Sequence, residues 1–433
     1  MPEVTPAIVG LGGLLRDPAC CVIKDGRIAS AVEQAKVSHQ DRPGSFPDEA
    51  FSIALSTAGI RVSDIDCVAV ARPLATGSES AQQLELRARF PRADIVVVEH
   101  HHAHAASAYY ASPFQQASVL SVDRAGDFRS ALLFDGRGND LTPCRELYFP
   151  DSLGDLFNRV TQLLGFEPRS EEHKVQWLST SGDAKYIQVF RDILHRDGSA
   201  WSQFDRSFFD SDRLTGGGFS TRFYEALGFR AGEELSATTR ADIAASLQAS
   251  IIETVARMLG DAGEVCIAGG LAFNALLIRS LEERFRRVFV QPAAGNHGTA
   301  LGAALYAWHN RYRQPQRIPF ETLCLGPSYT PAEIKRVVEN CKVRFRYLLT
   351  EAELIDSAVA ALNEYKIVGW MHGRMEFGPR ALGNRSILAS PLNPYSTENL
   401  NAYIKHRENF RKFAASVPVE VADEYFEVGP NAR

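Results

Sequence analysis

A strand-and-hairpin unit that occurs twice is the feature that most constrains the fold of this chain. The stretch PAIVGLGG is followed by ACCVIKDGRIASAVEQAKV, which predicts a strand and then a hairpin with its turn at Asp25–Gly26. The stretch ASVLSVDRAGDFRSALLFDGRGNDLTPCREL repeats this pattern, with a strand that ends near Asp123 and a turn at Asp135–Gly136. Two such units in one chain predict a duplicated α/β architecture.

The segments that follow each unit alternate between helical and strand patterns. Residues 45–60 have helical periodicity with acidic residues in the first turn, and residues 64–73 and 93–100 have the apolar character of buried strands. The second unit continues with a helix from residue 239, a strand at 264–270, a helix at 271–285, a strand at 288–295 and a helix at 299–308. This alternation is typical of an α/β protein.

The composition excludes several classes of protein. At 433 residues the chain is long enough for two or three domains. Its net charge of -5, without a long block of Lys or Arg, argues against nucleic acid and anionic membrane surfaces as partners. Seven cysteines without a close C-x-x-C pair argue against a disulfide framework, so we expect a reducing cytoplasm. No apolar run approaches the roughly 18 residues that span a bilayer, and no signal peptide is recognisable, so we expect no membrane partner.

The chain divides into a body at 1–318, a linker at 319–349 and a final domain at 350–433. Within the body, residues 186–236 fit neither the helical nor the strand period and are expected to form an insertion that covers a cleft. This segment carries several aromatic residues: Trp201, Phe204, Phe208 and Phe209. They are candidates for stacking on an acceptor, and the alternative is that they form a local core.

Four histidines in five positions, in the stretch VEHHHAHAASAYY, follow a strand of β-branched residues. His100 and His104 are four apart, so on a helix they share one face and both can reach one cation. Asp123, at the end of the strand in the second unit, is placed where such folds present ligands. The alternative is a polar helix start and an ordinary strand-end carboxylate.

Glycine-rich turns and a group of cations are the remaining candidate binding features. Gly269, Gly270 and Asn274, in CIAGGLAFN, follow a strand and suit contact with a nucleotide. The segment GRMEFGPRALGNRS and the following IKHRENFRKF concentrate six cations: Arg374, Arg380, Arg385, Lys405, Arg407 and Arg411. Guanidinium groups match the geometry of phosphate, so these cations predict an anion site, with a solvated basic face as the alternative.

Motifs along nearly the whole chain resemble the O-carbamoyltransferases that modify antibiotics and nodulation factors. The resemblance rests on HHHAHAASAYYASPF, YFPDSLGDLFNRVTQLLGF, HKVQWLST, AGGLAFN, PAAGNHGTALGAA and GRMEFGPRALGNRSILASPLN. It implies a duplicated actin-like (ASKHA) N-terminal domain, related to tRNA threonylcarbamoyl-transfer proteins, and a YrdC-like α+β C-terminal domain. It also implies that carbamoyl phosphate and ATP, with Mg, form carbamoyl-adenylate, from which the carbamoyl group passes to a hydroxyl of a small-molecule acceptor.

The resemblance also implies roles for individual residues. His100, His104, Asp123 and Asn296 fall at the family's metal positions, usually an iron site. Arg380, Lys405 and Arg411 fall at its phosphate-binding positions. Arg16 and Asp17, in LLRDP, fall in its FHDS segment and are the candidate catalytic residues.

Four departures from the family pattern bear on these roles. Asn296 replaces an acidic metal ligand, which removes a negative charge and predicts weaker metal binding. Arg16 replaces a histidine and has no basic lone pair with which to accept a proton. Arg124 replaces a glycine and is expected to crowd or recharge the nucleotide cleft. The sequence ends at EVGPNAR, which predicts an incomplete YrdC-like domain. We expect either that this domain associates with itself or with a partner chain through residues 345–433, or that the gene continues and the chain is a fragment.

Three functions remain open on these grounds. The first is carbamoyl transfer to a natural-product or sugar hydroxyl. The second is a catalytically impaired homologue that binds nucleotide or a partner chain, which the departures at Arg16 and Asn296 favour. The third, tRNA threonylcarbamoyl transfer, is less consistent with GRMEFGPRALGNRS in the same chain.

Overall fold

Two five-stranded sheets with the same strand order form the body of the protein. The computed structural model describes residues 5–40, 44–74, 78–210, 218–427 and 429. The first sheet has the order β3-β2-β1-β4-β5, and the second has the order β8-β7-β6-β9-β10. In each sheet the first three strands of the chain are antiparallel neighbours, the fourth pairs in parallel with the first, and the fifth pairs in parallel with the fourth. The predicted duplicated actin-like α/β architecture is therefore confirmed by the topology.

The strands of the first half are short and lie close to the predicted ranges. They are β1 Ile8–Gly12, β2 Ala19–Lys24, β3 Arg27–Glu33, β4 Cys67–Ala71 and β5 Asp94–Val98. The turn at Asp25–Gly26 has positive φ at both residues, 50° and 68°, as a two-residue hairpin loop requires. The hairpin prediction for this unit is confirmed.

The second half contains the longer strands, and one sequence prediction for it was wrong. Its strands are β6 Gln116–Gly126, β7 Arg129–Arg137, β8 Asp140–Tyr148, β9 Glu264–Ala268 and β10 Arg287–Val290. Asp135 and Gly136 lie inside β7, and the chain turns at Gly138 and Asn139 instead. Gly136 is needed for close packing, because a Cβ there would lie 2.8 Å from the Tyr109 ring.

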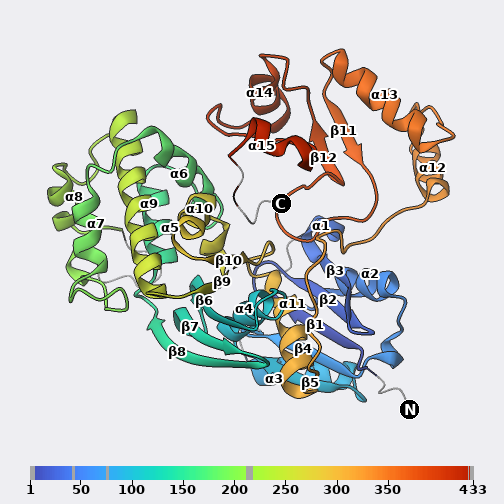
Figure 1. The fold of residues 1–433 in the computed structure, drawn as a ribbon, viewed down its shortest axis with the longest axis horizontal. Coiled ribbons are helices and arrows are strands. Elements are labelled where there is room, and N and C mark those ends of the chain that lie inside the picture. The colour runs from blue at the N-terminus through green and yellow to red at the C-terminus, as the bar shows by residue number, and fades with distance from the viewer. Residues whose placement is uncertain (1–4, 41–43, 75–77, 211–217, 428, 430–433) are drawn as a thin grey trace.

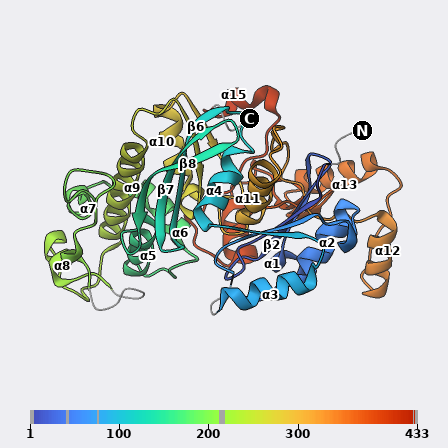
Figure 2. The same cartoon turned by 90° about the horizontal axis from the view of Figure 1, so that it is seen from below.

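Two helices lie between the sheets. They are α4 His100–Tyr109, which follows β5 and packs on β6 and β9, and α11 Gly298–Tyr306, which follows β10 and packs on β1, β2 and β4. Each half therefore places its last helix against the sheet of the other half, as Figure 2 shows. Both helices are rich in Ala and almost fully buried, so the two halves share one core.

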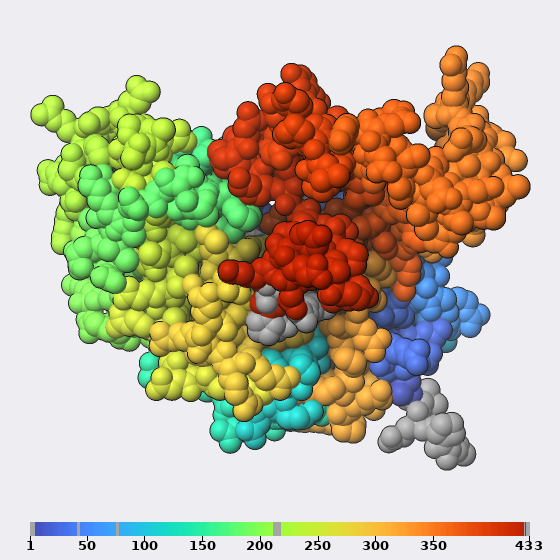
Figure 3. All heavy atoms as spheres, turned by 45° about the horizontal axis from the view of Figure 1, so that its top comes forward, coloured from blue at the N-terminus to red at the C-terminus, as the bar shows by residue number. Residues whose placement is uncertain are grey.

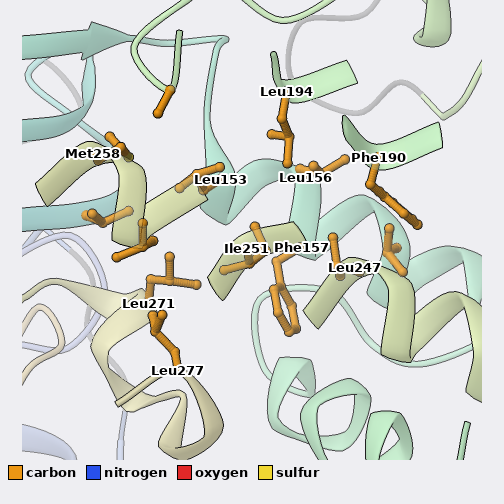
Figure 4. Packing of buried hydrophobic residues seen from close by; sticks show 14 of the residues in the cluster. Leu153, Leu156, Phe157, Phe190, Leu194, Leu247, Ile251, Met258, Leu271 and Leu277 are labelled. Carbon is orange, nitrogen blue, oxygen red and sulfur yellow. The ribbon is translucent and has the colours of Figure 1, made fainter. Parts of the chain in front are cut away.

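The outer face of each sheet is covered by its own helices. In the first half these are α2 Asp48–Ala58 and α3 Glu79–Arg89, with the short α1 Gln34–Ser38 after β3 (Figure 1). In the second half they are α5 Leu153–Leu163, α6 Glu172–Leu178, α7 Ile187–Leu194, α8 Thr221–Leu227, α9 Ala237–Leu259 and α10 Ala275–Arg284. Their buried side chains include Phe157, Phe190 and Ile251, which are labelled in Figure 4.

The predicted insertion at 186–236 contributes to this core. Of its four aromatic residues, Phe204 and Phe208 are buried among the apolar side chains of the second half, and Trp201 and Phe209 pack against the same cluster. Among the described residues of the segment none lines the main cavity of the body, and residues 211–217 lie outside the described residues. Its aromatics accordingly act as local core.

The C-terminal part is less deeply packed than the body. It comprises α12 Pro331–Asn340, α13 Glu351–Asn363, β11 Val368–Met371, β12 Arg385–Leu388, α14 Ser396–Asn399 and α15 Ala422–Tyr425. Helix α12 lies inside the expected linker, where Thr330 and Glu333 form a capping box with Pro331 at the first helical position. Neither α12 nor α13 has a buried residue. No helix of the described part of the chain has the length and apolar character needed to cross a bilayer.

Candidate active site

His100, His104 and Asp123 converge at the junction of the two halves. The Nε2 atom of His100 lies 2.9 Å from Oδ2 of Asp123, and the Nε2 atom of His104 lies 3.4 Å from the same oxygen. One donor atom from each residue lies within 4.8 Å of the other two. The start of α4 supplies both imidazoles and β6 supplies the carboxylate. The spacing of four residues places the two imidazoles on one helix face, as the sequence predicts.

The hydrogen bonds around the two imidazoles suit a cation at this position. The Nδ1 atom of His100 lies 3.3 Å from the carbonyl oxygen of Arg72, so Nδ1–H donates there and the Nε2 lone pair of a neutral ring faces the Asp123 carboxylate. Two such acceptors facing each other require a proton or a metal ion between them. Neither ring nitrogen of the buried His104 has a hydrogen-bond partner among the described residues. The donor set therefore fits a divalent metal, with a carbonyl that orients His100 in the usual way.

Burial and the single carboxylate determine how the pKa values of this cluster shift. Burial lowers the pKa of His104 to about 4, despite its contact with Asp123, and so keeps this imidazole in the neutral form that binds metals. Burial also disfavours charge on His100 and Asp123, but their mutual hydrogen bond and attraction outweigh it, raising the pKa of His100 and lowering that of Asp123. Gly126 makes room for the His100 ring, because a Cβ there would lie 2.0 Å from its Cδ2 atom.

The neighbouring histidines serve the structure. The Nε2 atom of His101 donates to the carbonyl oxygen of Arg129 at 3.1 Å, and its Nδ1 accepts from the Ser121 hydroxyl at 2.8 Å. The His102 ring packs edge-on against Phe134. Neither ring belongs to the group formed by His100, His104 and Asp123.

A cavity of about 490 Å³ lies beside Asp123 and collects most of the other predicted residues. It is lined by residues of both halves and of the C-terminal part: Arg16, Asp17, Asp123, Arg124, Gly154, Phe157, Asn158, Arg169, Ser170, Glu172, His173, Gln176, Gly270, Leu271, Phe273, Asn274, Gly295, Asn296, Pro379, Arg380 and Arg411. Gly269 and Lys405 do not line it, although both were predicted to bind cofactor. Figure 3 shows C-terminal residues, in red, lying over the junction of the body.

The glycine-rich turn after β9 has one residue that is open to a ligand and two that are structural. Gly269 has φ 94°, and a Cβ there would lie 2.1 Å from the carbonyl oxygen of Val122. The Asn274 side chain accepts from the Leu277 N–H to cap α10 and exchanges two hydrogen bonds with Gln248. Gly270 follows directly and lines the cavity.

Asn296 and Asp17 form a pair in the cavity wall. The Nδ2 group of Asn296 donates to Oδ2 of Asp17 at 3.3 Å. The amide oxygen of Asn296 accepts no bond from a described side chain, so it is the atom that remains for a cation. Asn296 stands where the family resemblance places an acid. Its hydrogen bond to Asp17 links the loop after β10 with the loop after β1.

Arg124 is directed toward a carboxylate instead of filling the cleft. Its Nη1 atom lies 3.3 Å from Oδ1 of Asp155, and Oδ2 of the same carboxylate accepts from Nε of Arg159 at 2.8 Å. The expected crowding of the nucleotide cleft is therefore partly relieved, and part of the added charge is neutralised.

The six predicted cations separate into two groups. Arg374 donates to carbonyl oxygens of Gly326, Ala29 and Leu325, and Arg385 donates to those of His372, Gly373 and Asn384. Arg407 donates to the Asn401 side chain at 2.7 Å. These three arginines hold loops together, because guanidinium forks bond carbonyl groups as readily as phosphates. Arg380 and Arg411 remain in the cavity wall, and Lys405 is exposed away from it.

Two contacts hold the C-terminal part over the cavity. The Lys174 ammonium on α6 pairs with Glu408, and Lys36 on α1 donates to the carbonyl oxygen of Glu376 at 2.9 Å. The buried Glu376 carboxylate accepts backbone N–H groups of Leu382, Asn384 and Arg385. These bonds fix the loop that carries Arg380.

Sequence reasoning missed several polar residues of the cavity wall, among them Arg169 and His173. Burial and the charges of Arg411, Arg380 and Lys174 lower the pKa of His173 to about 4. Its position beside Lys174 in HKVQWLST, a motif that carried the family resemblance, was the available signal. Arg169 lies between two helices and belongs to no motif.

Comparison with known proteins identifies the family. Residues 72–305 match the carbamoyltransferase N-terminus family and residues 359–432 match the carbamoyltransferase C-terminus family. The chain is 33% identical to the uncharacterized protein sll1178 of Synechocystis sp., over 97% of this chain and 77% of that protein. It is 30% identical to nodulation protein NolNO of Sinorhizobium fredii, over 97% of this chain and 65% of that protein.

A third relative has an enzyme name. The 3'-hydroxymethylcephem-O-carbamoyltransferase of Streptomyces clavuligerus is 31% identical over 42% of this chain and 34% of its own length. The matched family segments cover both the His–Asp cluster and the loop of Arg380. The chain therefore belongs to the carbamoyltransferase family of transferases.

Proposed function

We propose that this protein is an O-carbamoyltransferase that uses carbamoyl phosphate and ATP, through carbamoyl-adenylate, to modify a hydroxyl of a small-molecule acceptor such as a natural product or sugar. The observation that carries the proposal is one cavity whose wall holds Asp123 of the His–Asp cluster together with Arg380 and Arg411. A cation site and an anion site then face the same bound molecule. Family membership and the cephem O-carbamoyltransferase relative support carbamoyl chemistry at this site.

Arg380 and Arg411 are assigned to the phosphates of ATP, with Mg, and of carbamoyl phosphate. Neither guanidinium forms an ion pair with a carboxylate of the described residues, so both are available to an anion. Burial and then the neighbouring charges of Arg407 and Arg380 lower the pKa of Arg411, which indicates crowded positive charge. A bound phosphate relieves this repulsion and accepts charge-assisted hydrogen bonds.

His100, His104 and Asp123 are assigned to a divalent metal, which the resemblance suggests is iron. When bound, the metal would supply Lewis-acid stabilisation of the negative charge that develops during transfer. The protein holds the two imidazoles neutral and oriented through burial and the Arg72 carbonyl. The apolar rings of Phe157 and Phe273 in the cavity wall limit the access of water to the mixed anhydride.

In the transfer step, the acceptor oxygen bonds to the carbamoyl carbon as the bond from that carbon to the adenylate oxygen breaks. AMP leaves with the electron pair of that bond, and the hydroxyl proton passes to a base. Asp17 is assigned as this base, because it lines the cavity and its Asn296 partner occupies only one of its oxygens. Arg16 cannot take the proton, so its role is binding.

An impaired homologue that binds nucleotide without transferring a carbamoyl group is the second candidate. The observations that favour it are the guanidinium of Arg16 where the family resemblance places a histidine, and the amide of Asn296 where it places an acid. In that case the cavity would retain its anion site and lose transfer.

Exchange of labelled pyrophosphate into ATP, in the presence of carbamoyl phosphate, separates the two candidates. The enzyme should exchange label, and its Arg380→Ala variant should lose most of the exchange. The Arg145→Gln variant, which changes an exposed arginine on β8 outside the cavity, is the matched control. Tight ATP binding without any exchange or transfer would favour the impaired homologue instead.

A further inference from the structure

Two arginines of the cavity, Arg16 and Arg169, are not used by the assignments above. Arg16 comes from the loop between β1 and β2, and Arg169 comes from the loop between α5 and α6. Both residues line the cavity, and neither guanidinium forms an ion pair within the described part of the chain. By contrast, the cavity residue Arg124 pairs with Asp155. Unpaired guanidiniums that gather in one concave wall favour an anionic ligand.

The protein holds Arg169 in an unfavourable backbone conformation. Its φ is 70°, in the left-handed region that is unfavourable for a residue with a side chain. Its N–H donates to Oδ1 of Asn158 at 3.2 Å and to the Glu172 carboxylate, and its carbonyl oxygen accepts from the Arg16 guanidinium. These bonds fix the loop from three sides, in a form that places the Arg169 side chain in the cavity wall.

Two carboxylates, those of Asp17 and Glu172, adjoin this pair in the cavity wall. Glu172 accepts the Arg169 N–H, and Asp17 accepts from Asn296. Neither carboxylate forms an ion pair with Arg16 or Arg169, so the two guanidiniums have no ion-pair partner among the described residues. A neutral ligand would leave these two charges without a partner inside the complex.

The pair comes from other parts of the chain than the arginines assigned to the nucleotide. Arg380 and Arg411 come from the C-terminal part and lie beside His173, as their effect on its pKa indicates. Arg16 adjoins Asp17, which is bonded to Asn296 on the wall that also contains Asp123. Arg16 thus adjoins a residue assigned to transfer, whereas the arginines assigned to the donor phosphates belong to the C-terminal part.

We infer that Arg16 and Arg169 form a second anion subsite that takes a carboxylate or phosphate group of the hydroxyl acceptor. This inference rests on the proposed carbamoyl transfer and narrows it, because it names the acceptor as a negatively charged compound. The Arg16 guanidinium then has a role that the histidine of the family resemblance would not fill equally well, since it is always charged.

Calorimetry on the full chain, saturated with Mg and a non-hydrolysable ATP analogue, tests the subsite. Inorganic phosphate should still bind to one site per chain, and glucose 6-phosphate should bind at least about ten-fold more tightly than glucose. The affinity for inorganic phosphate and the preference for glucose 6-phosphate over glucose should each fall by about ten-fold or more in Arg16→Gln and in Arg169→Gly. The glycine variant removes the charge and the backbone strain together, so it should fold with an unchanged or higher Tm.

Three controls make the result decisive. Arg145→Gln should bind phosphate as the wild type does, and Arg169→Lys should retain part of the binding. Arg380→Ala should weaken binding of the ATP analogue, whereas Arg16→Gln and Arg169→Gly should not. Unchanged binding of the analogue in Arg380→Ala would count against the proposed function and not against the subsite. The inference is overturned if the ATP-saturated protein binds no phosphate, if glucose 6-phosphate binds no better than glucose, or if Arg16→Gln weakens ATP as strongly as Arg380→Ala.

Discussion

The two ends of the cavity are built in different ways. The His–Asp end comes from the start of a helix and the end of a strand, and its imidazoles are buried, with His104 at 0% and His100 at 5% exposure. The arginine end, with Arg380 and Arg411, comes from loops, and Arg380 is exposed. Packing fixes the first end in advance, whereas docking of the C-terminal part completes the second. The difference suits a metal ion that stays bound and anions that enter and leave.

The largest expected effect is the loss of metal from the His104→Ala variant. His104 is fully buried with two unpartnered ring nitrogens, so no nearby group can replace it as a ligand. We expect elemental analysis to find divalent metal in the wild type, below one ion per chain, and none in the variant. His102→Gln, which changes a ring that packs on Phe134, should keep the metal. Equal metal in the wild type and the His104→Ala variant would show that the cluster is only a buried hydrogen-bonded group.

Substitutions at the arginine end should lower the affinity for ATP without abolishing binding. Arg380→Ala removes one charge-assisted contact that contributes roughly 1.5–3 kcal/mol, so the affinity for ATP should fall by about ten-fold or more. Arg411→Ala should act similarly, and Lys405→Ala should have the smallest effect because Lys405 lies outside the cavity wall. Calorimetric titration of the three variants measures this order. Unchanged affinity in Arg380→Ala and Arg411→Ala would contradict the anion site.

The sequence predicted the His–Asp end better than the arginine end, for a physical reason. His100 and His104 lie on one helix, where a spacing of four residues determines the relative position of the side chains. Arg374 and Arg385 stand in the same motif as Arg380 but bond carbonyl oxygens, and spacing in a loop does not say which guanidinium faces a cavity. Arg169 could not be found at all, because its place depends on bonds to residues distant in the sequence.

The prediction of hairpin turns from local sequence has the same limit. Asp25–Gly26 and Asp135–Gly136 are the same dipeptide within similar apolar runs, yet only the first forms a turn. At Gly136 the determining factor is the Tyr109 ring, which belongs to a helix outside the local sequence. Local propensity therefore predicted the elements and their order, whereas tertiary contacts decided individual positions.

Asn296→Asp should have a moderate effect on metal affinity at the His–Asp end and on the free energy of unfolding. The new carboxylate adds a negative charge beside the His–Asp cluster, so the metal should bind several-fold more tightly. Without metal, the same carboxylate would face Asp17 in place of a hydrogen-bond donor, and the free energy of unfolding should fall. Thermal unfolding with and without added metal measures both effects. An Asn296→Ala variant with the same gain in metal affinity would show that charge is not the cause.

The smallest expected effect is a pH dependence at His173, where the two ends meet. Burial and the adjacent cations lower its pKa to about 4 in the folded protein, below the ordinary value of about 6.5. Between these two values the unfolded chain binds more protons than the folded one, so the free energy of unfolding should decrease as the pH falls from 6.5 to 4. The matched variant His173→Asn should show a weaker decrease in the same window. A phosphate bound by Arg380 and Arg411 cancels the charge that lowers the pKa, so the imidazole should titrate at a higher pH when ATP is present. NMR titration of the His173 ring with and without ATP measures this shift, and an identical pKa in both states would place the bound phosphates away from Arg380 and Arg411.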